Sequence, residues 1–259
     1  MSRTETQPAT TRTADRVGVA AGDGLHVGGR LVGELAARPI TSFANDRDVL
    51  WVLADRRHLF HVRDGTADRV AALDAPVGTC VHTHRGRVFV GGDEAGLWVL
   101  EQGVLMPVES FGEAPTRSEW HTPWGGPPAV FSMASHGDDL YVSVHVGGIL
   151  HSADGGRRWE ATIDLHDDVH QVAVDPDSGT VWAATGARGL AESTDHGRTW
   201  AHHTRGLHAT YLLAVAVTRA GVLVSAASGH AGRDGAVYLF DGTQFRRVDG
   251  LPDAMGGAV

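Results

Sequence analysis

The sequence predicts an all-β fold, a β-propeller of four-stranded blades, and two observations support this prediction. Residues 148–159 and 189–200 align at a constant offset of 41, the difference between 148 and 189, with Ser, Asp, Gly and Trp repeated in register. The surrounding segments alternate short apolar runs with Gly-rich turns, and the chain contains 34 glycines. A period of about 40 residues built from short strands and tight turns is typical of one propeller blade.

The strands follow from alternating apolar residues between turn clusters, starting from the clearest unit at residues 169–203. Shifting its inner strand by 41 aligns residues 130–133 and 212–215 with residues 171–174. Five whole blades result, and their strands outside residues 130–159 are expected at 40–43, 49–53, 59–62 and 69–73; 79–82, 87–90, 96–100 and 104–108; 169–174, 180–185, 190–193 and 199–203; and 212–215, 222–225, 236–240 and 245–248.

The remaining segments decide the blade number. Residues 16–20, 25–27 and 31–35 supply three strands without an inner one, and residues 255–259 supply at most one short strand. Joining both termini in one blade leaves no sheet edge unpaired, so we expect six blades. Seven blades are the alternative if the natural chain continues past Val259. We expect one propeller domain over residues 17–259, preceded by a disordered tail over residues 1–16.

Composition excludes several classes of partner. The formal net charge is −9, and all 22 basic residues are arginines scattered through loops, so no basic stripe exists for nucleic acid. The polar amino terminus has no apolar signal region, and no window approaches the roughly 18 apolar residues of a membrane span. We therefore expect a cytoplasmic protein without nucleic-acid or membrane partners. The single Cys80 lies in an apolar run and reads as a buried structural thiol.

The repeated turns resemble a known motif, the Asp box or BNR repeat of sialidase-like propellers. The residues that carry the resemblance are Ser152, Asp154, Gly156 and Trp159 in one copy and Ser193, Asp195, Gly197 and Trp200 in the other. The Asp carboxylate can accept backbone N–H bonds across the turn, the Gly can adopt positive φ, and the Trp can fill the space beside it. We expect these eight residues to be structural.

The resemblance implies several activities without choosing among them. Sialidases and other glycosidases, photosystem assembly factors and sortilin-type receptors all resemble this repeat, and fold alone does not fix function. The sequence argues against a sialidase, because it has no Arg-Ile-Pro-like motif near its start and no Glu matched to Tyr141, Tyr211 or Tyr238. Two hypotheses follow: a glycosyl-hydrolase-like or metal-assisted hydrolase or lyase acting on a small molecule or carbohydrate, and a non-catalytic scaffold or assembly factor that binds a protein.

Propeller connectivity places several polar residues at one mouth of the ring, opposite the Asp boxes. Loops between the second and third strands, and between blades, open on the same face. We expect His145, His170 and His208 to be the best metal ligands, because imidazole suits a divalent transition-metal ion, with Asp168 as a base or as a partner of His170. No HxH or HxxxH spacing fixes two of these histidines to one ion, so the sequence leaves a divalent metal as one alternative and indicates no other cofactor.

A long insertion at residues 109–128 supplies further candidates at this mouth. It carries two tryptophans and several prolines, which suits either a rigid lid, a sugar-stacking platform or a structural plug. The ligand-binding candidates at this mouth are Trp120, His121, Trp124, Arg188 and Tyr211. Glu119 and Asp168 could form the pair of carboxylates that glycosidic cleavage requires.

Overall fold

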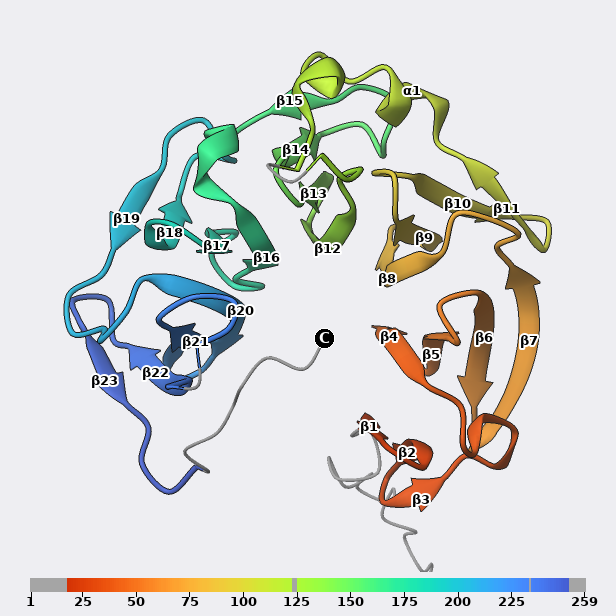
Figure 1. Ribbon diagram of the computed structural model, residues 1–259. Coiled ribbons are helices and arrows are strands. Elements are labelled where there is room, and N and C mark those ends of the chain that lie inside the picture. The colour runs from red at the N-terminus through yellow and green to blue at the C-terminus, as the bar shows by residue number, and fades with distance from the viewer. Residues whose placement is uncertain (1–17, 123–124, 233, 252–259) are drawn as a thin grey trace, which may run out of the picture.

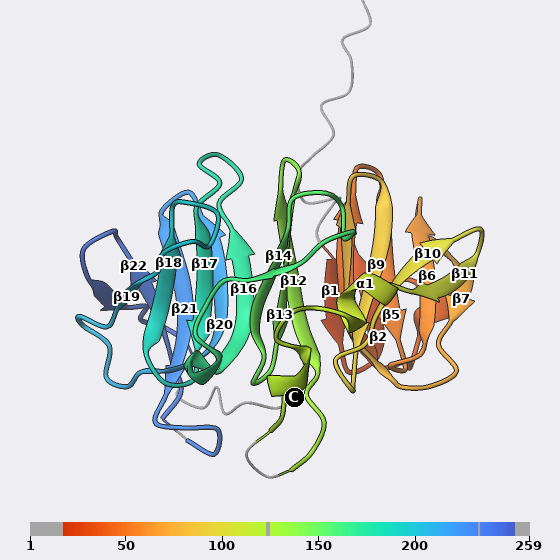
Figure 2. The same cartoon turned by 90° about the horizontal axis from the view of Figure 1, so that it is seen from above.

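The computed structural model describes residues 18–122, 125–232 and 234–251, and within them the protein is an all-β ring of six antiparallel sheets, open between the sheet of residues 211–247 and that of residues 18–31 (Figure 1). The sheets stand side by side around a central axis (Figure 1), and their strands run along that axis (Figure 2). Five sheets have four described strands and one has three. The prediction of a β-propeller of four-stranded blades is therefore confirmed, with six sheets in the ring.

Each blade is formed by strands that follow one another in the chain. The first three sheets contain β1 (Gly18–Ala21), β2 (Gly24–Val27) and β3 (Arg30–Leu31); β4 (Ile40–Asp46), β5 (Val49–Ala54), β6 (His58–Arg63) and β7 (Thr66–Ala72); and β8 (Gly78–His84), β9 (Arg87–Gly92), β10 (Leu97–Glu101) and β11 (Val104–Pro107). The last three contain β12 (Val130–His136), β13 (Asp139–Val144), β14 (Gly148–Ser152) and β15 (Glu160–Ala161); β16 (Val169–Val174), β17 (Val181–Thr185), β18 (Gly189–Ser193) and β19 (Ala201–His203); and β20 (Tyr211–Thr218), β21 (Gly221–Ala227), β22 (Ala236–Phe240) and β23 (Phe245–Arg247). In the described part of the chain, short helices lie in the connections at η2 (Gly33–Leu35), α1 (Glu109–Gly112), η3 (Arg117–Glu119) and η4 (Leu165–Asp167).

The innermost strand of each four-stranded blade begins with a β-bulge. In β4, β8, β12, β16 and β20 the pairing register shifts by one residue near the strand start. A bulge bends the strand and redirects one side chain. The five redirected residues lie at the same end of the ring, and they are Thr41, Thr79, Phe131, His170 and Leu213.

The observed pairing changes the alignment of two inner strands that the constant offset of 41 predicts. In the second strands Val144 and Thr185 occupy matching positions, 41 residues apart, as the repeat predicts. Their partners on the inner strands, Val130 and Val169, are only 39 residues apart. The reason is the hairpin at residues 175–180, which joins β16 to β17. Counted between matching pairs, it is two residues longer than the hairpin that joins β12 to β13. Phe131 therefore corresponds to His170.

Apolar residues fill the spaces between successive blades. Five buried clusters each combine residues of two neighbouring sheets, for example Trp182 and Leu190 with Leu212 and Phe240. Cys80 is unpaired and buried in one of them, and this burial raises the pKa of its thiol to about 12. The thiol is therefore protonated at neutral pH, in agreement with the structural role expected for it.

Side chains near the bulges also connect neighbouring blades. The hydroxyl of Ser132 accepts a hydrogen bond of 2.8 Å from the backbone N–H of Val172, and the side-chain oxygen of Gln171 accepts one of 2.8 Å from Val215. These bonds satisfy backbone donors that face the preceding blade rather than their own sheet. They hold the inner strands in fixed relative positions, on which the candidate site depends.

Several sequence predictions concern residues outside the described part of the chain. These are the disordered tail at residues 1–16, the closing strand at residues 255–259 and the ligand-binding role of Trp124. Among the described residues, no helix is long and apolar enough to cross a membrane.

Candidate functional site

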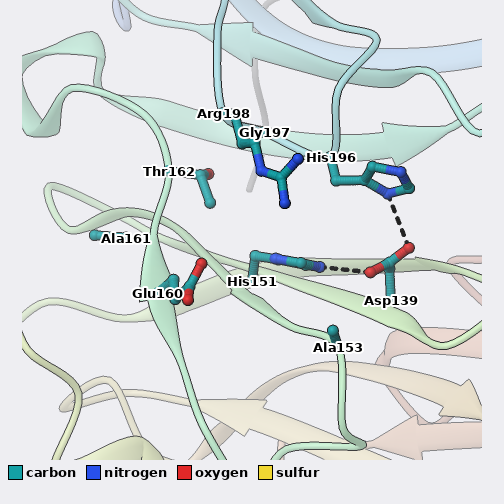
Figure 3. Close-up of a pocket in the computed structure, with 9 residues that line it drawn as sticks. All are labelled: Asp139, His151, Ala153, Glu160, Ala161, Thr162, His196, Gly197 and Arg198. Atoms are coloured by element: carbon teal, nitrogen blue, oxygen red, sulfur yellow. Dashed lines mark hydrogen bonds and ion pairs between the residues drawn. The ribbon is translucent and has the colours of Figure 1, made fainter.

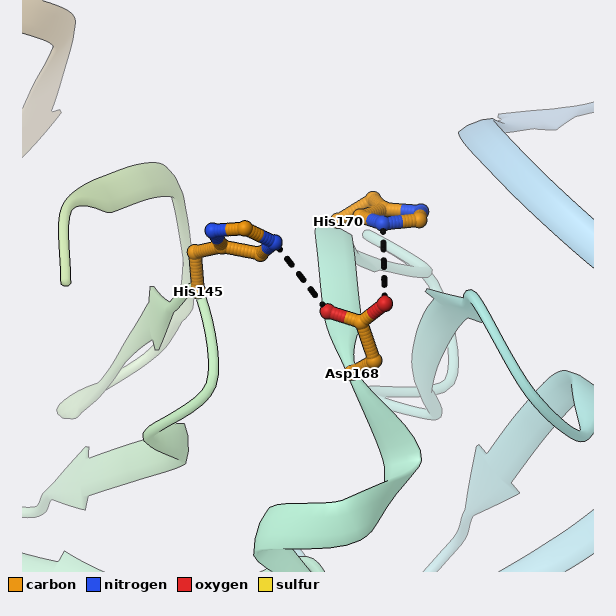
Figure 4. Close-up of side chains that lie close together, drawn as sticks. All are labelled: His145, Asp168 and His170. Carbon is orange, nitrogen blue, oxygen red and sulfur yellow. Dashed lines mark ion pairs between the residues drawn. The ribbon is translucent and has the colours of Figure 1, made fainter. Parts of the chain in front are cut away.

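Two histidines and an aspartate meet at the end of the ring where the inner strands begin. His145 follows β13, and Asp168 and His170 stand at the start of β16 in the next blade. Their ligand atoms all lie within 4.8 Å of one another. Figure 4 shows the Asp168 carboxylate between the two imidazoles, with Nε2 of His145 3.2 Å from Oδ1 and Nε2 of His170 3.4 Å from Oδ2. We call these three residues the His–Asp–His cluster.

The backbone around Asp168 shapes the cluster. Asp168 adopts a left-handed conformation with φ of 53°, which Asp tolerates better than most residues, and it ends the short helix η4. Its carbonyl accepts a hydrogen bond of 2.8 Å from the N–H of Gly186. A Cβ at Gly186 would lie 2.4 Å from Oδ2 of Asp168, so glycine at this position leaves room for the carboxylate.

The tautomer of His170 follows from its hydrogen bonds. Nδ1 lies 2.6 Å from the carbonyl oxygen of Leu212, and because a carbonyl only accepts, Nδ1 carries a proton. In the neutral ring Nε2 then has a lone pair, and it faces Oδ2 of Asp168. Two lone pairs at this distance repel each other unless a proton or a metal cation lies between them. Burial lowers the pKa of His170, but the bonds to Asp168 and Leu212 outweigh it and raise that pKa.

The carboxylate of Asp168 has an unsatisfied oxygen. Oδ1 is buried and receives no hydrogen bond of good geometry from the described residues, although Nε2 of His145 lies at an ion-pair distance. The imidazoles of His145 and His170 hold the pKa of Asp168 well below its usual range, against the effect of burial. Asp168 is therefore an anion at neutral pH, and each of its two oxygens faces one imidazole.

Two further aromatic rings extend the cluster on either side. Phe131 stacks on His145 with centroids 4.5 Å apart and planes 13° apart, and Tyr211 lies 4.8 Å from His170. Since the His145 and His170 rings are 6.0 Å apart, four rings form one continuous row. Sequence analysis named Tyr211 but missed Phe131. The shift of 39 rather than 41 residues hid its correspondence with His170.

The structure does not bring His208 to this cluster. Its Nδ1 lies 2.8 Å from the hydroxyl of Tyr238, and its Nε2 lies 3.3 Å from Asp234. Both ring nitrogens of His208 thus have partners elsewhere: Tyr238 lies on β22, and Asp234 lies in the loop between β21 and β22. The residue that completes the group with His145 and His170 is Asp168, which the sequence interpretation treated as a base or as a partner of His170.

The other residues predicted for this mouth have separate surroundings. Trp120 is 6% exposed and packs against Phe111 in the apolar cluster between two blades. Glu119 and His121 are exposed, and Nδ1 of His121 donates to the backbone oxygen of Glu119 at 2.8 Å. The Arg188 guanidinium donates to the buried carboxylate of Asp167 at 3.0 Å. Among the described residues, none of these side chains joins the His–Asp–His cluster.

The repeated Ser-Asp-Gly-Trp turns lie at the opposite ends of the strands. In the first copy the hydroxyl of Ser152 donates to Asp154 at 2.9 Å and accepts from the N–H of Gly156 at 2.8 Å. The Asp154 carboxylate accepts two further backbone N–H bonds, and Trp159 is buried against Phe111. The second copy repeats the bonds among Ser193, Asp195 and Gly197 at the same distances. The Ser and Asp side chains are thus used within their own turns, whereas the indole N–H of Trp159 donates to Ser110 and that of Trp200 to the carbonyl of Thr162.

A second polar cluster lies beside these turns. Asp139 joins two blades, since its carboxylate oxygens lie 2.6 Å from Nε2 of His151 and 3.0 Å from Nδ1 of His196 (Figure 3). These residues line a cavity of about 290 Å³ together with Glu160 and Arg198. Both Asp139 oxygens are occupied, so this cluster differs from the one around Asp168 in having no buried acceptor left over.

Comparison with known proteins supports the fold but not a family. No family model matches the chain, and no curated protein matches it. Solved structures do. The chain is similar to YCF48 bound to D1 peptide, with 15% identity, a TM-score of 0.58 and coverage of 90% of this chain and 79% of that one.

Two other similar structures belong to much longer chains. An ancestral GH74 enzyme has 15% identity and a TM-score of 0.62 over 83% of this chain. The extracellular domain of BT4673 from B. thetaiotaomicron has 14% identity and a TM-score of 0.58 over 83% of this chain. This chain spans 32% and 28% of their lengths. At such identities the likeness shows a shared propeller fold.

Proposed function

We propose that this propeller binds a small molecule through a divalent transition-metal ion held by His145, Asp168 and His170. The observation that carries the proposal is that the ligand atoms of these three residues lie within 4.8 Å of one another, with the Nε2 atoms of both imidazoles facing the carboxylate. Two imidazoles and one carboxylate suit Zn²⁺ and Fe²⁺, and a set of three protein ligands leaves positions open for a ligand or water.

The surroundings of His170 favour a metal over a purely structural ion pair. Histidines that bind metals usually donate their second ring N–H to a carbonyl or carboxylate, which fixes the tautomer and the ring orientation. The bond from Nδ1 of His170 to Leu212 has this form. The Asp168 side chain is 31% exposed, so solvent reaches part of this residue, whereas the His170 side chain is 6% exposed.

A metal at this position would also support the hydrolase or lyase hypothesis. A bound cation lowers the pKa of a coordinated water or polarises a carbonyl oxygen of a substrate. Glycosidic cleavage by Glu119 and Asp168 has no comparable observation in its favour, because among the described residues the group that converges on Asp168 consists of His145 and His170. Binding is therefore the function to test first, and hydrolysis follows from it.

Zinc titration of purified, untagged protein tests the proposal. We expect one Zn²⁺ per chain by competition with a chromophoric chelator, and at least a tenfold loss of affinity in Asp168→Asn, because the amide lacks the negative charge. His208→Ala is the matched control, since His208 lies in a different network, and it should bind zinc as the parent does. Absence of stoichiometric metal in the parent, or equal affinity in Asp168→Asn, would contradict the proposal.

A second candidate function is the binding of an extended peptide, as in a scaffold or assembly factor. The observations that favour it are the similarity to YCF48, a structure determined with a peptide, and the exposed Phe43 and Phe131 on inner strands, at 37% and 39%. Selection from a displayed peptide library should then yield sequences that bind the parent and fail to bind Phe43→Asp. Selected peptides that bind both proteins equally would argue against this surface.

A further inference from the structure

We infer that Asp167, the residue before the ligand Asp168, is a positioning residue that fixes Asp168 between the two imidazoles of the His–Asp–His cluster. The inference rests on the proposed metal function and adds the residues that set the geometry of the site. Asp167 is not one of the three residues whose ligand atoms converge. Its carboxylate is 1% exposed, and its two oxygens contact side chains of two other segments of the same blade.

The Asp167 carboxylate ties the short helix η4 to the rest of its blade. Oδ1 accepts a hydrogen bond of 3.0 Å from the guanidinium of Arg188, in the loop between β17 and β18. Oδ2 lies 3.1 Å from Nε2 of His202 on β19, and because a carboxylate only accepts, this nitrogen is the donor. Asp167 itself ends η4, where its N–H donates to the carbonyl of Asp164 at 3.0 Å. One buried side chain therefore connects three segments.

The loop that carries Arg188 also holds the backbone of Asp168. The N–H of Gly186 donates to the carbonyl of Asp168 at 2.8 Å. The loop is itself fixed, since the hydroxyl of Thr185 accepts from the N–H of Arg188 at 3.0 Å and donates to the carbonyl of Gly189 at 2.9 Å. The same loop thus holds Asp168 by its carbonyl and the preceding residue by its side chain. Together these bonds fix the backbone on both sides of the left-handed φ of Asp168.

Helix η4 also packs against the preceding blade, which carries His145. Leu165 lies against the apolar cluster that contains Leu150. A Cβ at Gly148 would lie 3.4 Å from Cδ2 of Leu165, so the helix and the start of β14 are in close contact. Because η4 stands between the two blades that supply the imidazoles, its position sets the distance from the Asp168 carboxylate to His145.

A buried ion pair contributes to position more than to stability. Removing a carboxylate from water costs free energy that the attraction of its partner often only balances, and an apolar residue of similar volume often stabilises a fold as well. A buried carboxylate with two partners nevertheless favours one arrangement of the segments that it joins. This gives Arg188 a role different from the one expected from the sequence, because it acts through Asp167 instead of on a ligand.

Zinc competition with two variants tests this positioning. Arg188→Ala removes one partner of Asp167 at a side chain that is 54% exposed, so the protein is expected to fold. Direct partners of metal ligands contribute about tenfold to a hundredfold to metal affinity, and because Asp167 acts through the backbone we expect a smaller loss, of about threefold to tenfold. His202→Gln removes the other partner and should give a loss of similar size. Arg188→Lys keeps a donor and should recover part of the affinity.

His203→Gln is the matched control, since His203 is the next residue on β19 and its Nε2 lies 2.7 Å from Glu192 instead of Asp167. It should bind zinc as the parent does. The visible absorption of Co²⁺-loaded protein separates positioning from a general loss of stability, because it depends on the arrangement of the ligands around the ion. At full occupancy the spectrum should change in Arg188→Ala and remain that of the parent in His203→Gln.

Three results would overturn the inference. They are parent zinc affinity in both Arg188→Ala and His202→Gln, an unchanged Co²⁺ spectrum in Arg188→Ala, and a loss of affinity in His203→Gln equal to that in Arg188→Ala. A parent protein that binds neither zinc nor cobalt would instead refute the proposed function, on which the role of Asp167 depends.

Discussion

Acidification should destabilise this propeller through His82, a histidine on the inner strand β8. Its Nε2 lies 2.9 Å from the hydroxyl of Ser135 in the next blade. Burial first, and the nearby His84 second, lower the pKa of His82 from 6.5 to about 4. The folded protein therefore holds this imidazole neutral at pH values where the unfolded chain protonates it.

The sign and size of the effect follow from this difference in pKa. The free energy of unfolding is not reduced by His82 above pH 6.5. It falls as the pH drops from 6.5 toward 4, because the unfolded state then binds a proton that the folded state does not. With these two pKa values, lowering the pH from 7.5 to 5 should cost about 2 kcal/mol of unfolding free energy. His84 is buried with an unpartnered Nε2, and its pKa is also lowered, so it acts in the same direction.

Urea unfolding at pH 7.5 and pH 5.0, followed by tryptophan fluorescence, measures this loss. The variant His82→Gln keeps an amide that can reach Ser135 but cannot gain a proton, so it should lose about 2 kcal/mol less than the parent over the same interval. Carboxylates and the other histidines are common to both proteins and cancel in the comparison. His230→Gln, at an exposed position, is the matched control and should follow the parent. Identical pH dependence in parent and His82→Gln would refute the reasoning.

Three further predictions concern single contacts. Gly186→Ala should lower zinc affinity at least tenfold in the same chelator competition, because the new Cβ displaces the carboxylate of Asp168. Gly33→Ala is the control, since a Cβ at Gly33 has no atom within 4 Å, and it should bind zinc as the parent does. Equal zinc affinities of the two variants would disprove this prediction. Trp159→Ala should cost about 3–5 kcal/mol in urea unfolding, since the indole is 5% exposed, and a loss below about 1 kcal/mol would show that its packing contributes little. Asp139→Asn should lower the free energy of unfolding by about 1–3 kcal/mol, because the amide nitrogen cannot accept a hydrogen bond from an imidazole. A melting temperature in calorimetry equal to that of the parent would contradict this prediction.

The repeat was sufficient to predict the blades because their information is local. Gly156 and Gly197 mark turns with positive φ, and the alternation of apolar residues marks strands that bury one face. Each blade repeats the same local problem, so one well-marked unit identifies the others. The opposite placement of the Asp boxes and the histidine loops also followed from connectivity, since antiparallel strands alternate between the two ends of the ring.

The composition of the candidate site needed the tertiary structure. Sequence analysis grouped His145, His170 and His208, and the structure instead places Asp168 between the first two and His208 against Tyr238. A constant offset gives the face on which a residue lies, but ligand atoms must meet within a few ångströms. That precision depends on loop length and backbone conformation, such as the left-handed φ of Asp168, which no repeat records.

The sequence by itself therefore determined the fold, the turns and the end of the ring at which polar side chains gather. Only the tertiary structure decided which of them meet, because a bulge in β12 exposes Phe131 and Gly186 leaves space for a carboxylate. The physical reason is one of range. Strand periodicity and turn conformation are set by neighbours in the chain, whereas the His–Asp–His cluster combines side chains of two blades whose spacing is fixed by packing between sheets.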